Sequence, residues 1–317
     1  MFLGFFEEPQ AFFEAVVGGK SVGVPGLLRM LELAHQHHGT LPWKSLFSPA
    51  IKLAERGFAI SPRLHGLIAR DKYLRTSAAA KGYFYTPEGD PLAVGEKLVN
   101  RPLARTFRAI AQNGTGVFYE GWVAQDIVAA IREAPDNPGT LSLADLAAYK
   151  AKERRALCRP YRRWQICGMP PPSSGGITLL QSLGILESFN LASLDPATTE
   201  TVHLLAEATR LAFADRNAYL ADPDFISVPQ QELLDSGYLS ERASLISPHK
   251  RIKRVFPGTP DHLQQLNLMP GETFGYPSTT HISVIDGEGN AVAMTSSIEN
   301  TFGSRLMVHG FLLNNQL

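Results

Sequence analysis

The chain has 317 residues, and its 30 basic and 30 acidic side chains leave no formal net charge. Because the charges cancel, no net field draws the protein to nucleic acid or to an anionic membrane. With 44% hydrophobic and 19% charged residues, the chain can bury a large core, which excludes disorder, coiled coil and collagen. No run of about 18 apolar residues occurs, so no membrane-spanning segment is expected.

Residues 26–38 predict the first clear helix, because their leucines recur at helical spacing between Pro25 and Gly39. Similar patterns predict helices over 43–57, 100–113, 121–133, 142–149, 176–189 and 198–220. Strand-like patterns are few before residue 240, and 164–169 is the best of them. We therefore expect a mostly helical N-terminal portion.

Within these elements, several polar groups invite a functional interpretation, and we favour a structural one for each. His35, His37 and His38 do not have the i, i+4 spacing of a helical metal site, and a polar helix end beside Gly39 is favoured. No metal or other cofactor is expected for the protein. Residues 170–176 could form an anion-binding turn, but a stiffened helix start is favoured. Residues 198–220 include Glu207, Asp215 and Arg216 and predict a packed helix with an ion pair.

The chain contains only two cysteines, Cys158 and Cys167. So small a number excludes a disulfide scaffold and a cysteine-rich zinc module. A single disulfide between them could form in an oxidising compartment, but we expect two reduced, packed thiols.

A long irregular connector and a hairpin follow. Residues 257–278 hold seven Pro or Gly among 22, which predicts a connection without regular structure. Alternating runs at 280–285 and 291–297 flank a Gly-rich turn and predict a β-hairpin. If the hairpin folds symmetrically about Glu288, one face is rich in hydroxyls and the other is apolar. The hydroxyl-rich face then carries Thr279 opposite Ser297, His281 opposite Thr295, and Ser283; the apolar face carries Ile282, Val284, Val292 and Met294.

Thr279 stands where the connector meets the first strand. A threonine there can act as a nucleophile if the bond before it is cut, since its own α-amine, with a pKa of about 7.7–8.0, can take the hydroxyl proton. The cut would begin with attack of the Thr279 hydroxyl on the Ser278 carbonyl. The Ser297 hydroxyl across the ladder would hold the nucleophile by a hydrogen bond. Ordinary β-propensity also explains threonines at the start of a strand.

Several stretches, taken together and in order, resemble the gamma-glutamyltranspeptidase family of self-processing N-terminal-nucleophile hydrolases. The matching stretches are 23–26, 47–54, 116–119, 172–176, 213–216, 222–223, 279–281, 286, 289–293, 301–303 and 312–316. The resemblance implies an α+β fold, an incomplete αββα sandwich preceded by a mostly helical portion. It also implies a large-subunit portion, 1–278, and the start of a small subunit, 279–317, which associate after self-cleavage.

The resemblance further implies a function. Thr279 would attack a γ-glutamyl amide such as that of glutathione, and the ester would pass to water, an amino acid or a peptide. Ser297 would assist the nucleophile, while Glu299 and Gln316 would bind the substrate. Glu299 stands where better-known members have asparagine; a carboxylate can still accept from the substrate ammonium, but the change leaves a related glutaryl or cephalosporin-type acylase as an alternative.

Other family residues are expected outside the given sequence. The arginine for the substrate α-carboxylate would precede Met1. An aspartate, a serine pair and two oxyanion-hole glycines would follow Leu317, and losing one such donor typically costs about 2.7–4 kcal/mol in the transition state. We therefore expect a piece of a longer protein that has little or no activity by itself, so an inert fragment is a further alternative.

Overall fold

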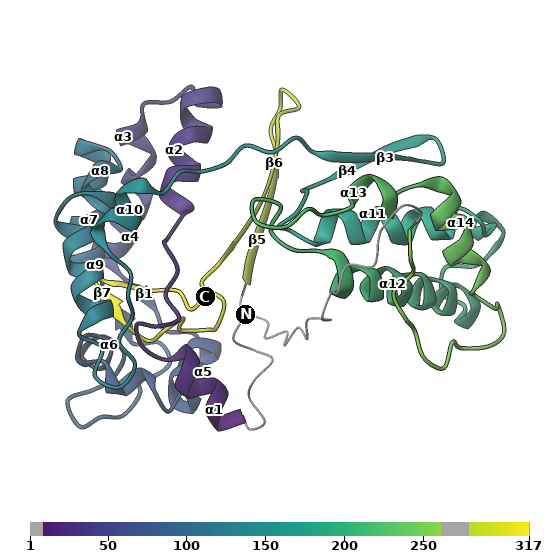
Figure 1. Ribbon diagram of the computed structural model, residues 1–317. Coiled ribbons are helices and arrows are strands. Elements are labelled where there is room, and N and C mark those ends of the chain that lie inside the picture. Colours follow the sequence, from purple (N-terminus) through teal and green to yellow (C-terminus); the bar gives the residue numbers. More distant parts are fainter. Residues whose placement is uncertain (1–8, 261–278, 317) are drawn as a thin grey trace. The chain divides into compact units, whose positions relative to one another are not determined.

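The computed structural model describes residues 9–260 and 279–316 (Figure 1). Two compact units divide the chain. The first unit holds the described residues up to Lys152 and from Thr279 on, and the second holds those from Glu153 on to residue 260. Helices and strands both occur, as the α+β class requires. Over the described ranges the strands form four separate antiparallel pairs, whereas a sandwich needs larger sheets.

The first unit is built mainly from helices. Its helices are α1 (Pro9–Val16), α2 (Leu27–His38), α3 (Trp43–Leu46), α4 (Ser48–Arg56), α5 (Pro62–Arg70), α6 (Ala78–Phe84), α7 (Arg101–Asn113), α8 (Gly116–Tyr119), α9 (Trp122–Arg132) and α10 (Leu143–Ala148), with a short 3₁₀ turn at Leu74–Thr76. The helices predicted over 26–38, 100–113, 121–133 and 142–149 are confirmed. The one predicted over 43–57 is divided at Phe47, where Pro49 opens α4 because its missing N–H is not needed in a first turn.

Two apolar clusters form the core of the first unit, and both include residues from beyond position 279. One cluster lies among helices α7, α8, α9 and α10 and contains Tyr119, Ile127, Val308 and Leu313. The other surrounds α5 and α6 and contains Phe302. Short strand pairs accompany these clusters: β1 (Phe58–Ala59) with β2 (Lys97–Leu98), and β7 (Met307–Val308) with β8 (Phe311–Leu312). The C-terminal segment is thus packed into a core formed mainly by the N-terminal helices.

The second unit combines one hairpin with a helical cluster. Its elements are β3 (Leu157–Tyr161), β4 (Trp164–Gly168), α11 (Gly175–Leu186), a 3₁₀ turn (Leu191–Ser193), α12 (Thr199–Tyr219), α13 (Gln230–Leu233) and α14 (Ser236–Ser244). The predictions at 164–169, 176–189 and 198–220 are confirmed. The core of this unit lies where α11 contacts α12 and α14. Of the predicted connector, the structure describes only 257–260, which is irregular; 261–278 lie outside the described residues.

The expectation of two reduced, packed thiols is wrong. Cys158 and Cys167 form a disulfide, with a Cα–Cα distance of 4.1 Å. Both are exposed, and they are direct partners in the register of β3 and β4. The physical reason is the pairing of the two strands, since facing residues of an antiparallel pair have side chains close enough to bond.

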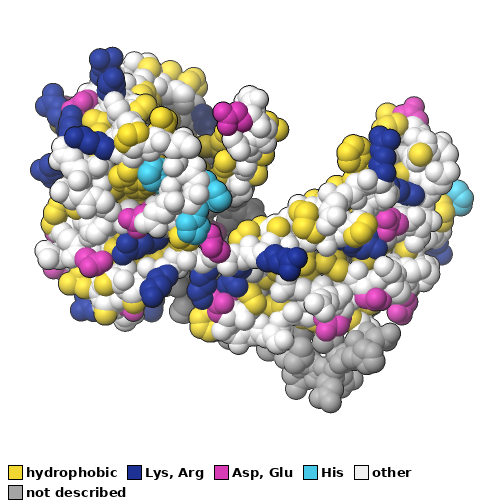
Figure 2. All heavy atoms as spheres, turned by 90° about the horizontal axis from the view of Figure 1, so that it is seen from above, with side chains coloured by type: hydrophobic (Ala, Val, Ile, Leu, Met, Phe, Trp, Pro, Cys, Tyr) yellow, Lys and Arg dark blue, Asp and Glu magenta, His cyan; other side chains and the backbone are white. Residues whose placement is uncertain are grey.

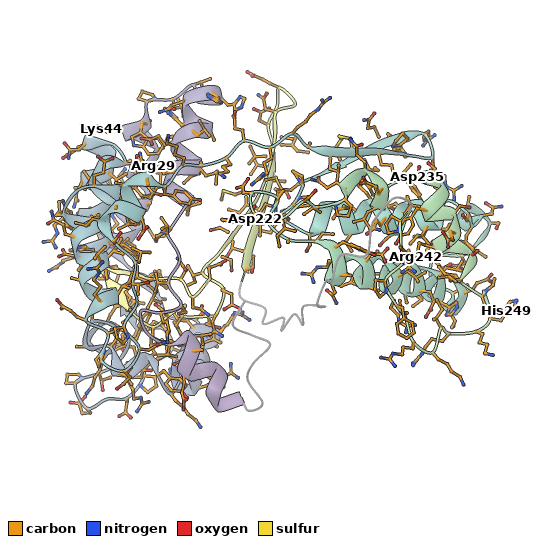
Figure 3. All side chains as sticks on the ribbon, in the orientation of Figure 1. Arg29, Lys44, Asp222, Asp235, Arg242 and His249 are labelled. Atoms are coloured by element: carbon orange, nitrogen blue, oxygen red, sulfur yellow. A yellow bond between two sulfur atoms is a disulfide. The ribbon has the colours of Figure 1, made fainter. Side chains whose placement is uncertain are left out.

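An ion pair forms within 198–220 as predicted, between Glu207 and Arg210 at 2.6 Å, and a second one joins this helix to another. Asp215 on α12 is fully buried and accepts at 3.1 Å from Arg242 on α14, the arginine labelled in Figure 3. Burial raises the pKa of the Asp215 carboxyl, against the opposing influence of Arg242 and three hydrogen bonds. Arg216 instead donates to the Ser174 hydroxyl at 2.9 Å, which ties α12 to the start of α11. That contact agrees with a structural role for the 170–176 segment.

Candidate active site

The predicted hairpin is present with the predicted register. Strands β5 (Thr279–Ile285) and β6 (Ala291–Ser297) pair antiparallel, with Thr279 opposite Ser297 and His281 opposite Thr295. The turn is closed by the Asp286 N–H, which donates to the Asn290 carbonyl at 3.0 Å. Gly289 adopts φ +87°, the left-handed conformation that such a turn requires and glycine allows.

Hydrogen bonds cross the hydroxyl-rich face of the hairpin. The Thr279 hydroxyl donates to Ser297 Oγ at 3.2 Å. One ring nitrogen of His281 lies 2.8 Å from the Thr295 hydroxyl and the other 3.1 Å from that of Ser283. The face predicted from sequence therefore carries two hydrogen-bonded groups, the Thr279–Ser297 pair and the imidazole of His281 with two hydroxyls. On the opposite face Ile282, Val284 and Val292 are exposed.

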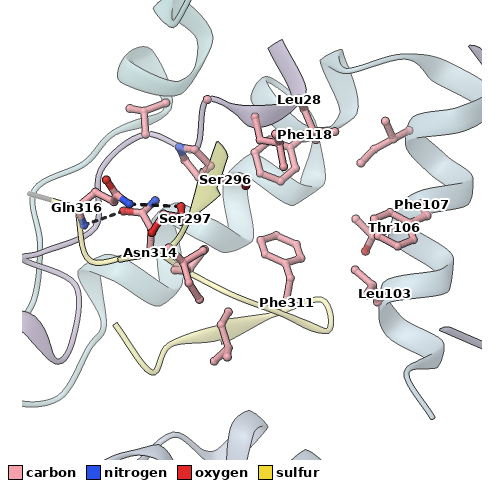
Figure 4. Close-up of a pocket in the computed structure, with 18 of the residues that line it drawn as sticks. Leu28, Leu103, Thr106, Phe107, Phe118, Ser296, Ser297, Phe311, Asn314 and Gln316 are labelled. Atoms are coloured by element: carbon pink, nitrogen blue, oxygen red, sulfur yellow. Dashed lines mark hydrogen bonds between the residues drawn. The ribbon is translucent and has the colours of Figure 1, made fainter. Parts of the chain in front are cut away.

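Ser297 contacts every other predicted catalytic or binding residue. Besides accepting from Thr279, its hydroxyl oxygen accepts from the Glu299 N–H at 2.9 Å. The Gln316 side chain donates to the Ser297 carbonyl at 3.3 Å (Figure 4). The four residues named from sequence are thus brought together at the end of β6. Ser278, on the other side of the predicted cut, lies outside the described residues.

Two asparagines that the sequence analysis did not single out hold this arrangement. Asn315 donates through Nδ2 to a carboxylate oxygen of Glu299. Asn314 accepts from the Gln316 N–H at 3.1 Å and exchanges two hydrogen bonds with the backbone of Gly23, at 3.0 and 2.8 Å. Both lie in the run 312–316 that carries the family resemblance, and this was the signal that could have identified them.

A cavity of about 630 Å³ opens beside Ser297 and Gln316 (Figure 4). Its walls are mostly apolar, and Asn314, Ser297 and Gln316 supply polar atoms at one end. The apolar walls come from α2, α7, α8 and β8 and include Leu28, Leu103, Phe107, Phe118 and Phe311. An apolar cavity with a few grouped polar atoms is the usual form of a small-molecule site.

Tyr119 fixes the segment that leads into α2 along this cavity. Its hydroxyl donates to the carbonyl of Pro25, a lining residue, at 2.6 Å, and accepts from the Arg29 N–H at 3.2 Å. Burial, opposed by the hydrogen bond and charge of Arg29, raises the pKa of Tyr119 to about 12. The phenol therefore stays protonated at neutral pH and keeps donating to Pro25.

Neither a metal site nor a membrane span is found in the parts of the chain that the structure describes. No three or more His, Cys, Asp or Glu side chains gather there as metal ligands would. None of the described helices has both the length and the apolar character to cross a bilayer. On the face shown in Figure 2, basic and acidic side chains are interspersed rather than separated by sign.

A threonine that opens a strand and is held by a serine hydroxyl across a hairpin, with a cavity beside that serine, is the arrangement expected of an N-terminal-nucleophile hydrolase. Comparison with known proteins then specifies the family. A family model described as gamma-glutamyltranspeptidase matches residues 2–317. The chain belongs to the gamma-glutamyltranspeptidase family.

Individual relatives agree with this assignment. The chain is 39% identical over 315 residues to a glutathione hydrolase proenzyme of Bacillus subtilis, covering 96% of this chain and 53% of that protein. It is 37% identical over 307 residues to an acylase ACY 1 proenzyme of a Pseudomonas species, covering 95% and 52%. The crystal structure of Helicobacter pylori gamma-glutamyltranspeptidase superimposes with a TM-score of 0.75 at 32% identity, covering 83% of this chain and 76% of that one. The chain spans about half the length of the two proenzymes.

Proposed function

We propose that the protein to which this chain belongs is a γ-glutamyl transferase or hydrolase that cleaves γ-glutamyl amides such as glutathione, with Thr279 as its nucleophile. The observation that carries the proposal is the hydrogen bond from the Thr279 hydroxyl to Ser297 Oγ, at 3.2 Å, at the start of the hairpin. Family membership over residues 2–317 supports it, as does the cavity beside Ser297.

The first reaction is a single self-cleavage. The Thr279 hydroxyl attacks the carbonyl carbon of Ser278, and the peptide nitrogen of Thr279 leaves as an amine after taking up the proton. The resulting ester joins the Ser278 acyl group to the Thr279 oxygen. Water hydrolyses that ester, which leaves a carboxylate on Ser278, a free hydroxyl on Thr279 and a free α-amine. Nucleophile and base are then on one residue.

The second reaction is turnover of the substrate. The Thr279 α-amine accepts the hydroxyl proton as the oxygen attacks the γ-amide carbonyl, and the same proton goes to the leaving amine. The γ-glutamyl ester passes to water, an amino acid or a peptide. Ser297 holds the nucleophile, the Glu299 carboxylate accepts from the substrate α-ammonium, and Gln316 contributes to the same subsite. A charged acceptor makes the stronger hydrogen bond with an ammonium.

The same proposal covers the fold and subunits of the whole protein. Residues 1–278 form the large-subunit portion, and 279–317 begin a small subunit that completes an αββα sandwich. Support comes from the first unit, where Phe302, Val308 and Leu313 are buried with residues of the N-terminal helices. Burial of this kind, about 25 cal/mol per Å² of apolar surface, holds the two pieces together once the peptide bond is cut.

The related acylase is the second candidate, because Glu299 departs from the usual asparagine and an acylase proenzyme is 37% identical to the chain. The two candidates differ in the acyl group, since a glutaryl group lacks the α-ammonium of a γ-glutamyl group. We expect the full-length protein to hydrolyse γ-glutamyl-p-nitroanilide faster than glutaryl-p-nitroanilide, and Thr279→Ala to hydrolyse neither. Preference for the glutaryl compound would establish the acylase instead.

Whether the 317-residue chain is active by itself needs a separate test. If an isolated 1–317 polypeptide turned over γ-glutamyl-p-nitroanilide at the rate of the full-length protein, the inert-fragment interpretation would be excluded. We expect it to show little or no turnover.

A further inference from the structure

A connected series of polar contacts runs from the end of α5 to the Glu299 carboxylate, through Arg305, Asn300 and Asn315. Arg305 and Asn315 are each 3% exposed and Asn300 is 8% exposed. A buried charge persists in a folded protein where it is paired and hydrogen-bonded. The reaction steps described above use none of these three residues.

The series begins with a buried ion pair. One oxygen of the Asp71 carboxylate accepts from Arg305 Nη2 at 2.8 Å and from Arg305 Nε at 3.2 Å. The other oxygen accepts from the N–H groups of Tyr73 and Leu74, at 2.9 and 2.8 Å. Four donors fix the carboxylate directly after α5. The plane of the Arg305 guanidinium is fixed in turn, because two of its nitrogens bond one oxygen.

The guanidinium then orders the loop that carries Glu299. Arg305 Nη2 donates to Asn300 Oδ1 at 2.9 Å, and Nη1 donates to the Gly303 carbonyl at 2.6 Å. Glu299 has φ +71°, a left-handed conformation that a non-glycine residue keeps only where its surroundings hold it. The two contacts of Arg305 hold Asn300 and Gly303, which follow Glu299 in the same loop.

The last contact sets the direction of the carboxylate. The Asn300 N–H donates to Asn315 Oδ1 at 3.0 Å, which leaves the Nδ2 of the same amide to face Glu299. That Nδ2 donates to one oxygen of the Glu299 carboxylate. Since an amide has one acceptor end and one donor end, occupying the acceptor determines which end Glu299 meets.

We propose that Arg305, held by Asp71, is a positioning residue that orients the Glu299 carboxylate through Asn300 and Asn315 and thereby sets the preference for an acyl group that carries an α-ammonium. The inference rests on the proposed function. Asp71 and Arg305 lie on opposite sides of the predicted cut, so after cleavage the large-subunit portion would control acyl selection in the small one without a covalent link.

The test compares two inhibitors that differ only in the ammonium, L-glutamate and glutarate, against hydrolysis of γ-glutamyl-p-nitroanilide by the full-length protein. Arg305→Lys keeps the charge but loses the planar fork that bonds Asp71, Asn300 and Gly303 together. We expect the KM for the anilide and the inhibition constant of L-glutamate to rise roughly tenfold, with kcat and the inhibition constant of glutarate changed less than about twofold. Asn315→Ala, which leaves the ion pair intact, should reproduce this pattern.

Two further variants separate positioning from general destabilisation. In a Glu299→Gln background, Arg305→Lys should add less than about a twofold change. Asp215→Asn breaks a matched buried ion pair in the second unit; it should lower the melting temperature while leaving the ratio of the two inhibition constants unchanged.

The outcomes distinguish failure of the proposed function from failure of the positioning role of Arg305. Wild-type protein that does not hydrolyse the anilide would overturn the proposed function and this inference with it. An active wild type, together with Arg305→Lys and Asn315→Ala variants that shift both inhibitors equally or neither, would overturn the inference alone.

Discussion

At the residue scale, Ser297 is the point on which the site depends. Its hydroxyl oxygen accepts from the Thr279 hydroxyl at 3.2 Å and from the Glu299 N–H at 2.9 Å. A hydroxyl oxygen has two acceptor lone pairs, so both donors can be satisfied at once. One side chain therefore couples the position of the nucleophile to the position of the residue proposed to bind the substrate.

Replacing Ser297 tests this coupling. Ser297→Ala removes an acceptor worth about 0.5–1.5 kcal/mol, and we expect self-cleavage of the full-length precursor to slow roughly 2- to 12-fold. Ser297→Thr keeps the hydroxyl and should cleave at close to the wild-type rate. The rates can be measured from the decay of the precursor band on a denaturing gel. Equal rates for Ser297→Ala and wild type would show that the hydrogen bond has no role in cleavage.

Asp286, in the turn of the hairpin, gives a prediction for pH. The side chain and N–H of Asn290, with the N–H groups of Glu288 and Gly289, lower the pKa of its carboxyl below the ordinary value of 3.8, against slight desolvation. Because the folded pKa is the lower one, the turn is stabilised above pH 3.8, and this contribution is lost as the pH falls through the folded pKa. The carboxyl ¹³C shift should titrate below 3.8 in the native protein and nearer 3.8 in Asn290→Ala. Identical midpoints would contradict the prediction.

At the scale of elements, the hairpin was predictable and the neighbouring contacts were not. Alternation of polar and apolar residues around one Gly-rich turn determines both the register and the faces, so Thr279 could be placed opposite Ser297 from sequence alone. Strand β3 gave no such signal, because it contains Pro160, a residue that weakens a strand prediction. Without β3, nothing in the sequence placed Cys158 beside Cys167, and the bridge was missed.

The disulfide should stabilise the β3–β4 hairpin. The cysteines are nine residues apart, and closing a loop of that length restricts the unfolded chain by about 2.6 kcal/mol in the chain-entropy description. We expect the Cys158→Ser/Cys167→Ser double variant to unfold at lower urea concentration than oxidised wild type. Adding dithiothreitol should lower the wild-type midpoint and leave that of the variant unchanged. A wild-type midpoint insensitive to the reductant would contradict the bridge or its contribution.

At the scale of the whole molecule, the sequence predicted the family and most long helices, whereas the contacts that hold the site depend on tertiary structure. Asp71 and Arg305 are 234 positions apart, and no periodicity or motif connects residues at that distance. Arg305 also adopts φ +65°, which local propensity disfavours. The N-terminal helices and the C-terminal segment are thus positioned by contacts between residues far apart in the sequence.

The division of the chain into two units follows packing rather than the predicted cut. The residues after Thr279 belong to the same unit as those before Lys152, while Glu153 begins the other. Under the proposed function, cutting before Thr279 would therefore produce two polypeptides that share one core. We expect them to remain together on gel filtration under native conditions.

The most direct test is the intact mass of the full-length gene product after incubation. We expect two polypeptides from the wild-type protein, the shorter with Thr279 as its first residue and a free α-amine, and a single uncut polypeptide from Thr279→Ala. A wild-type protein that hydrolyses γ-glutamyl-p-nitroanilide while remaining one uncut chain, or one whose new N-terminus lies at another residue, would contradict this expectation.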